Sequence, residues 1–495
     1  MKTFSKKIEL WILIVIGTLP ACSDFLDLAP KDKLSEDTFY KTPEEILFAL
    51  NASYATLNTE AVMKNWYVLS EIPSDNTYGN LSGTVTDKDE FDKFYLRSLN
   101  PFLNSFWNGS YAGINRVNTV IEKLPESGVD ELLKDRYTKE AKFLRAYLHF
   151  NLVRIFGDIP LMNRTISIKD SYEVLRSDKG EVYKQIVADL MEASDLPASY
   201  SAAEDIGRAT SGAAKALLGK VYLTMGDYAK AEEQLKAVID SKRYHLIENT
   251  ILGTCDGFEK YFDPDNHGNS EAIFEAQFKK GGFGKGSGWV NAFAPAGSGD
   301  NVVAIGSSGD DNIPEEGMWE SWDEGDFRRS FSMAMGYTDK KTGEWVSARY
   351  VSKYRDIPYA NYDCNNNWPI LRYADVLLMY AECLIQKDDL ANACEYLNRT
   401  RRRGFGYLST AIGAPCDITP INKDQMILAI EKERRNELAF EGHRWFDLIR
   451  TGRALAVMKA TGKKLNETNF ISPIPQAQID INPKLVQNDY RIEPK

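Results

Sequence analysis

The fold is decided by residues 212–243, which read GAAKALLGKVYLTMGDYAKAEEQLKAVIDSKR. Apolar residues recur there at the spacing of one helix face, on both sides of a Gly-Asp-Tyr turn at residues 226–228. Gly219 and Ala231 are small enough for two helices to approach closely. Larger side chains fill the space between those helices: Leu218, Tyr222 and Leu235. The stretch therefore predicts a helical hairpin.

The same pattern returns later in the chain, with Tyr380, Ala381, Ala393 and Leu397 around an Asp-Asp turn. These are the marker positions of a tetratricopeptide repeat, whose hairpins stack because one hairpin cannot bury its own apolar face. Two further hairpins show a looser helical periodicity. We therefore expect a mainly α fold with about four hairpins in a right-handed scaffold, at about 103–156, 209–244, 372–404 and 423–460.

The segment 245–370 does not follow this pattern. Glycines crowd its middle, at positions 281, 282, 284, 286 and 288, and aromatic residues lie in or beside that run. Glycine at this density indicates irregular loop at the surface. Because long ordered loops in a helical scaffold commonly carry function, we predict a loop-rich lobe with some short strands that binds a ligand.

The N-terminus has the layout of a secretory signal, with three lysines in the first seven residues, an apolar run at 10–19 and the small residue Ala21. The run is about half as long as a membrane-spanning helix needs. Residues 19–22, Leu-Pro-Ala-Cys, are similar to a bacterial lipobox. We expect a signal peptide at 1–21 and lipidation of Cys22, with an ordinary signal peptide as the alternative.

Composition and motifs favour binding over catalysis. A net charge of −11 argues against nucleic acid as a partner, and 43% hydrophobic with 26% charged residues is a globular balance. The chain contains no GxSxG elbow, P-loop or GxGxxG fingerprint. Asp263 and Asp265 hint at a calcium loop, but His267 and Phe274 stand where further ligands belong. We expect no cofactor, no metal and no enzymatic activity.

One charged and aromatic block, residues 434–448, reads RRNELAFEGHRWFDL. Arg434, Glu437, Glu441 and Arg444 have helical spacings at which opposite charges can pair. The following Trp-Phe pair at 445–446 would cover a neighbouring hairpin. We interpret the block as a buried polar and aromatic clasp rather than an active site.

This block and several other segments, in this order, carry a resemblance to a known family: 22–27, 145–147, 156–161, 372–382, 434–448 and 473–488. They resemble the SusD/RagB family, the surface nutrient-binding lipoproteins of Bacteroidetes. The resemblance implies one SusD-like domain over 22–495, anchored by lipid to the outer membrane and facing outward. It also implies a SusC-like TonB-dependent transporter as partner, over which the protein acts as a lid.

The resemblance implies capture of oligosaccharides for import, or of peptides in a RagB-like branch. A surface glycoside hydrolase and a scaffold that binds only proteins are the other readings. Sugar rings pack on aromatic planes, and Asp or Asn can bind their hydroxyls. Our candidate ligand-binding residues are Trp289 first, then Trp66, Asp75, Asn76 and Tyr78, each aromatic having core packing as its alternative.

Overall fold

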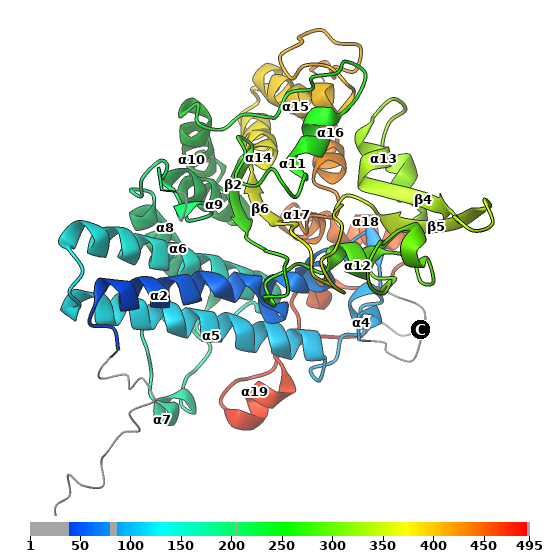
Figure 1. Cartoon of the computed structure of the whole chain (residues 1–495). Coiled ribbons are helices and arrows are strands. Elements are labelled where there is room, and N and C mark those ends of the chain that lie inside the picture. Colours follow the sequence, from blue (N-terminus) through cyan, green and yellow to red (C-terminus); the bar gives the residue numbers. More distant parts are fainter. Residues whose placement is uncertain (1–38, 80–86, 203–204, 421, 493–495) are drawn as a thin grey trace, which may run out of the picture.

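The computed structural model describes residues 39–79, 87–202, 205–420 and 422–492 (Figure 1). The predicted signal peptide at 1–21 and Cys22 lie outside the described residues. Within them, no helix has both the length and the apolar content needed to cross a bilayer.

Helix pairs lie at each predicted hairpin position (Figure 1). They are α5 (Pro101–Lys123) with α6 (Glu131–Phe156), α9 (Ser211–Thr224) with α10 (Tyr228–Asp240), α14 (Tyr373–Gln386) with α15 (Leu390–Gly404), and α16 (Lys423–Glu437) with α17 (Arg444–Arg450). A Cβ on Gly219 would stand 2.7 Å from the Leu235 side chain. This close approach is the one that the repeat pattern predicts, and the mainly α fold is confirmed.

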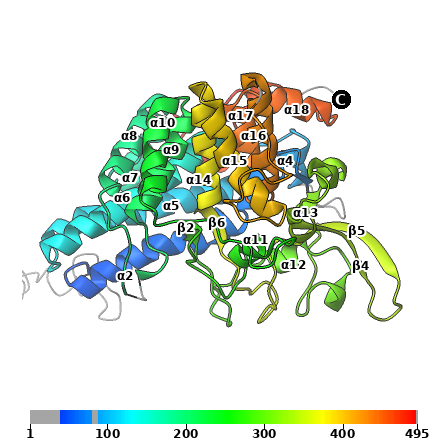
Figure 2. The same cartoon turned by 90° about the horizontal axis from the view of Figure 1, so that it is seen from above.

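The sequence analysis missed α8 (Lys179–Ala193), which packs between α6 and α9. Its buried residues Val182, Ile186 and Leu190 recur every four positions, and Asp178 caps its start, so the signal was present. With α8 in place, α5, α6, α8, α9, α10, α14 and α16 form one continuous row of packed neighbours. Seen from above, α8, α9 and α10 lie on the side opposite the strands β4 (Met333–Thr338) and β5 (Trp345–Val351) (Figure 2).

The last hairpin is broken more than the sequence predicts. Phe440 and Gly442 both adopt left-handed backbone angles, with φ of 65° and 77°, so α16 ends at Glu437. The returning segment then divides at Gly452 into α17 and α18 (Ala454–Ala460). The predicted single returning helix is therefore two short helices.

Two segments outside the repeats lie along the first hairpin. The helix α2 (Pro43–Tyr54) packs on α5 and begins with a capping box between Thr42 and Glu45. The C-terminal tail, with α19 (Gln476–Ile481), is fixed by backbone hydrogen bonds from Ser472 to Ile155 at 2.7 Å and from Gln476 to Ser98 at 2.8 Å. The tail therefore lies as a strap along the first hairpin.

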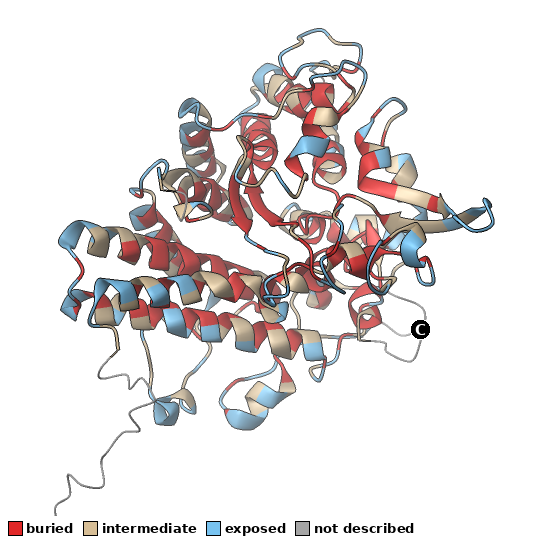
Figure 3. Ribbon diagram, viewed as in Figure 1, coloured by how far each residue is buried: buried red, intermediate tan, exposed pale blue. Residues whose placement is uncertain are grey.

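The lobe at 245–370 holds short strands and helices, as expected. Three two-stranded antiparallel sheets form: β1 (Thr77–Tyr78) with β3 (Ile313–Pro314), β2 (Ala272–Ala276) with β6 (Trp368–Arg372), and β4 (Met333–Thr338) with β5 (Trp345–Val351). The remaining short helices are α3 (Trp66–Ser70), α4 (Asp89–Asp92), α7 (Ile168–Ser171), α11 (Asp256–Tyr261), α12 (Trp289–Phe293) and α13 (Arg328–Ser332). Exposed residues concentrate in the outer loops and at the outer faces of the helices (Figure 3).

A buried cluster of charges joins the lobe to the repeats. Arg372, at the end of β6, donates to Glu437 at 2.7 Å, to Glu271 at 2.9 Å and to Glu441 at 2.7 Å. Arg328 donates to Glu437 and Glu433, both at 2.7 Å, and Arg403 also pairs with Glu437. We call these residues the Arg372 cluster: Glu271, Arg328, Arg372, Arg403, Glu433, Glu437 and Glu441. All are almost completely buried.

The clasp prediction is right about burial and wrong about partners. Glu437 and Glu441 bind Arg372, whereas Arg434 binds Asp375 and Asp447, each at 2.9 Å. Arg434 and Glu437 both lie in α16 but are paired with other elements, and the helix ends before Glu441, so the predicted i, i+3 and i, i+4 pairs are not found among the described residues. Burial raises the pKa of Glu437, but the guanidiniums of Arg403, Arg372 and Arg328 outweigh it and hold that pKa well below its usual range.

Candidate functional site

The first predicted ligand residue, Trp289, lies in the core of the lobe. Its side chain is 1% exposed, and its Nε1 donates to the Lys64 carbonyl at 3.0 Å. The rings of Phe278 and Trp368 lie 4.9 Å from its ring, between centroids. A sugar has no access to this ring in the structure, so Trp289 takes the core-packing alternative.

Three other candidates are also buried. Trp66 stacks on Phe446, with ring centroids 5.7 Å apart. Asp75 accepts two hydrogen bonds from Arg444, at 2.7 and 3.0 Å. The amide oxygen of Asn76 accepts from Arg435 at 2.8 Å, and its amide nitrogen donates to Glu71 at 2.8 Å.

These buried positions correct the expectation that Trp66, Asp75 and Asn76 contact the ligand. The strand β3 covers the segment: Glu315 N donates to the Asn76 carbonyl at 2.9 Å, and Thr77 Oγ1 donates to Asn312 at 2.7 Å. Tyr78 is the candidate that keeps partial exposure. Ligand contact by Tyr78 stays a prediction that no observation here tests.

The glycine-rich loops make room for side chains of a second loop, residues 355–363. A Cβ on Gly282 would stand 3.3 Å from the Tyr359 ring, and one on Gly288 would stand 2.8 Å from the Tyr362 ring. A Cβ on Gly286 would stand 1.9 Å from the Asp363 carboxylate. The glycine density therefore reflects specific packing against residues 359–363, and not only the freedom of a surface loop.

Hydrogen bonds fix this second loop in place. The buried Asp363 carboxylate accepts from the backbone N–H of Gly281 at 3.0 Å and of Gly282 at 2.7 Å. Lys280 Nζ pairs with Asp356 at 2.6 Å and donates to the Ile357 carbonyl at 2.9 Å. Because the two loops hydrogen-bond each other, the backbone that carries their outward-facing side chains is fixed in position.

Large apolar side chains stand out from these loops. Phe283 is 72% exposed, Tyr359 63% and Tyr362 39%. We call these three rings the aromatic platform. Ile357 and Ile305, 67% and 43% exposed, extend the apolar surface. Exposed apolar side chains gathered on ordered loops mark an interaction site more often than chance.

Polar groups lie beside the platform. The Asn361 amide oxygen accepts from Ser307 N at 2.9 Å, and among the described residues its amide nitrogen has no protein acceptor. Tyr362 holds a left-handed backbone, φ 58°, because its N–H donates to Asn291 Oδ1 at 3.1 Å. Aromatic planes with hydrogen-bonding groups at their edges suit ligands that have apolar faces and hydroxyl rims.

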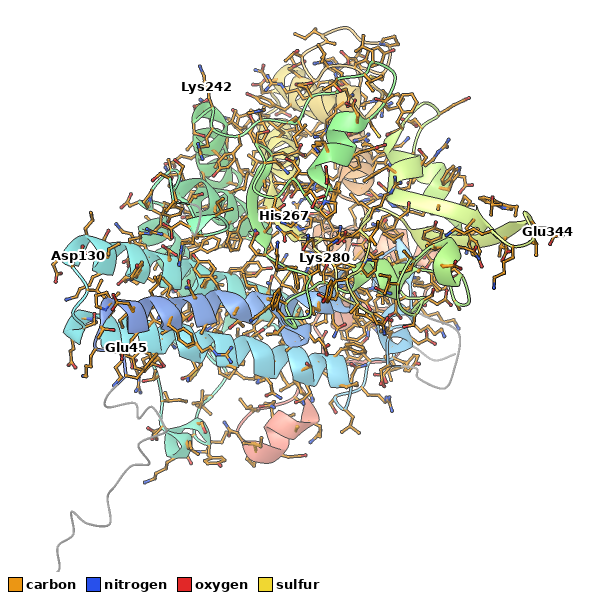
Figure 4. All side chains as sticks on the ribbon, in the orientation of Figure 1. Glu45, Asp130, Lys242, His267, Lys280 and Glu344 are labelled. Atoms are coloured by element: carbon orange, nitrogen blue, oxygen red, sulfur yellow. The ribbon has the colours of Figure 1, made fainter. Side chains whose placement is uncertain are left out.

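A half-open cavity of about 340 Å³ lies beside the strand β2. Its wall combines aromatic and polar side chains, among them Tyr200, Arg208, Tyr244, Glu275 and Gln277. The side chain of Asn58 donates both to the Gln277 carbonyl at 2.8 Å and to the Lys285 carbonyl at 3.0 Å, which joins the cavity wall to the glycine loop. Figure 4 labels Lys280 of the glycine loop and His267, which precedes the cavity-lining residue Gly268.

The chain is similar to known proteins in sequence and in fold. A family model described as "SusD family" matches residues 258–490, and one described as "Starch-binding associating with outer membrane" matches 24–223. The chain belongs to the SusD/RagB family. Together the two matches cover most of the chain, with a gap at 224–257 that contains α10.

Among its relatives, SusD-like protein P2 of Formosa agariphila is 28% identical over 98% of this chain and 99% of its own. A SusD homolog from Bacteroides thetaiotaomicron has a TM-score of 0.77 at 26% identity, covering 90% of this chain and 96% of that one. A structure described as a laminarin binding SusD-like protein has a TM-score of 0.74 at 27% identity, over 91% and 100% of the two chains.

The sequence analysis missed all three platform residues. Phe283 stands in the glycine run that was singled out, so the composition around it was a usable signal. Tyr359 and Tyr362 lie in a short loop without periodicity, and no local pattern separates them from buried tyrosines such as Tyr354. Among the described residues no group of three His, Cys, Asp or Glu side chains could hold a metal ion.

Proposed function

We propose that this protein captures oligosaccharides on the aromatic platform and delivers them to a SusC-like TonB-dependent transporter. The observation that carries the proposal is the platform itself, three exposed rings on two loops that hydrogen-bond each other. Sugar rings present C–H faces that pack on such rings, and Asn361 supplies a donor for a hydroxyl. The described relative that binds laminarin supports a glycan as the ligand class.

In this proposal the protein is a lipoprotein, anchored through Cys22 to the outer membrane and facing the extracellular side. The lipobox-like residues 19–22 and the family description of association with the outer membrane support it. Capture requires no bond-breaking chemistry, so we propose a binding protein and not an enzyme. A peptide ligand and a hydrolase activity are outcomes that the tests below would reveal.

Calorimetric titration of the purified mature chain against neutral and acidic oligosaccharides, and against peptides, tests ligand capture. We expect binding to an oligosaccharide and about a tenfold loss in Tyr359→Ala, since tenfold corresponds to roughly 1.4 kcal/mol and a lost aromatic stack is of that order. Trp345→Ala is the matched control, because Trp345 is 62% exposed on β5, outside the platform. Binding to peptides alone would overturn the proposal, as would turnover of the bound sugar.

The anchor and the transporter are tested in cells. Metabolic acyl labelling should mark the wild-type chain and not Cys22→Ala, and surface protease should reach the labelled chain. Affinity purification from solubilised outer membranes should recover a TonB-dependent transporter. An unlabelled wild-type chain would reject the anchor without affecting the ligand proposal.

A further inference from the structure

Lysines flank Phe283 in the sequence of the glycine loop, where Phe283 is the platform ring at the tip. Residues 279–286 read KKGGFGKG, and the Lys279 N–H donates to the Lys285 carbonyl at 2.9 Å. This bond closes a tight loop, with Lys279 and Lys285 at its base and Phe283 exposed at its tip. Lys64, at the end of the π-helical turn Glu60–Lys64, lies close enough to Lys285 for their charges to interact.

These lysines differ from the others nearby in having no ion pair. Lys280 is neutralised by Asp356 at 2.6 Å, whereas among the described residues no ion pair forms at Nζ of Lys64, Lys279 or Lys285. We call these three the free lysines. Burial lowers the pKa of Lys64, and the positive charge of Lys285 adds to that shift. Burial is the larger of these two effects, because it removes water from around the ammonium group.

Among the described residues, the acidic groups near the free lysines form no ion pair with them. Glu60 and Asp363 act on the pKa of Lys64 in the opposite direction to Lys285 and more strongly, but neither makes an ion pair with it. The Asp363 carboxylate is buried and accepts two backbone N–H groups, and Asp356 is already paired with Lys280. On a chain whose net charge is −11, residues 279–286 carry three lysines and no acidic residue.

We propose that the glycan captured here carries anionic substituents, as uronate carboxylates or as sulfate esters. This inference rests on the proposed function and narrows it to a substrate class. A sugar ring packed on Phe283 or Tyr359 would place ring substituents toward the free lysines, two of which stand at the base of the Phe283 loop. An ammonium–anion hydrogen bond is stronger than a neutral one.

Matched oligosaccharide pairs test this on the purified mature chain. One pair is an oligogalacturonate and its methyl ester, and the other is a sulfated galactan oligosaccharide and its desulfated form. At about 20 mM salt we expect the charged member of at least one pair to bind at least tenfold more tightly. At about 0.5 M salt the preference should shrink, because screening weakens exposed charge pairs. Which pair shows the preference separates carboxylate from sulfate.

The double variant Lys64→Gln/Lys285→Gln should remove most of the preference and leave binding of the neutral member unchanged. Lys341→Gln is the control, because Lys341 is exposed in the β4–β5 turn, where Figure 4 labels Glu344 away from Lys280. Thermal unfolding should be the same for all three proteins. Equal affinity for charged and neutral members, lost in Tyr359→Ala, would overturn the anionic class and keep glycan capture. Absence of binding to every oligosaccharide would overturn both.

Discussion

The Arg372 cluster and the aromatic platform are built from similar residue types, charged side chains next to aromatic rings, yet they differ in whether those groups have partners. In the cluster, the single side chain of Arg372 contacts three carboxylates. The ring centroids of Phe258 and Tyr261 lie 5.8 and 5.4 Å from its guanidinium. On the platform, Phe283 faces solvent and Lys285 has no ion pair among the described residues.

The difference indicates which region is structural and which can bind. Burying a charge is costly unless it is paired and hydrogen-bonded, so a buried cluster persists only when its groups match one another. Matched groups have no capacity left for a ligand. Exposed rings, and lysines that have no ion pair among the described residues, keep that capacity. The most recognisable sequence block, residues 434–448, consequently belongs to the architecture.

Low pH should have the largest effect, because it acts on the buried, paired carboxylates and thereby on the free energy of unfolding. The arginines and lysines around Asp375, Asp447 and Glu437 outweigh burial and hold all three pKa values well below the usual range. Groups with depressed folded pKa values stabilise above the unfolded pKa, about 4, and lose that contribution as the pH falls further. We expect the free energy of unfolding, from urea titrations, to fall steeply below about pH 4. The slope should be shallower in Asp447→Asn; an equal slope would contradict this account.

Removing one carboxylate from the cluster should have the next largest effect. Glu437→Gln leaves Arg328, Arg372 and Arg403 short of a shared counter-charge, and breaking a buried ion pair costs about 3–5 kcal/mol. Denaturant unfolding measures the loss. Glu344→Gln, exposed in the β4–β5 turn, should stay within about 0.5 kcal/mol of wild type. A loss at Glu437 no larger than that at Glu344 would show that the cluster is not structural.

A methyl group under the platform should act on both stability and binding. Gly286→Ala places a Cβ against Asp363, and such overpacking costs about 1–3 kcal/mol. Because Asp363 fixes the loop that carries Tyr359, glycan affinity should fall as well. Gly317→Ala is the control, since no atom lies within 4 Å of its added Cβ. Undiminished affinity in a folded Gly286→Ala protein would separate Asp363 from the site.

The smallest expected effect distinguishes ring from hydroxyl on the platform. Tyr359→Phe keeps the exposed plane and removes only an exposed O–H, so affinity should stay within about twofold while Tyr359→Ala loses about tenfold. Calorimetric titration with the tightest oligosaccharide measures both. If the phenylalanine variant loses as much as the alanine variant, the hydroxyl and not ring stacking makes the contact.

Much of the fold was predictable because repeat packing is local. Leu218, Gly219 and Ala231 lie within one hairpin, so their spacing reports their contacts directly. Even α8, which was missed, shows the pattern in Val182, Ile186 and Leu190. The partners of Glu437 and Asp75 could not be read from spacing. Arg372 and Arg444 reach them from other elements, over separations that no helical period describes.

The sequence by itself determined the helical repeats, the glycine-rich lobe and the family, while the signal peptide at 1–21 and the lipidation of Cys22 stay predictions. Only the tertiary structure decided that Trp289 is buried while Tyr359 is exposed, and that among the described residues Lys280 has an ion pair while Lys285 has none. The physical reason is that burial and charge pairing depend on which distant segments cover a residue. Trp289 packs against Trp368 of β6, and Lys280 pairs with Asp356 of the loop at 355–363, both more than 70 positions away in the chain.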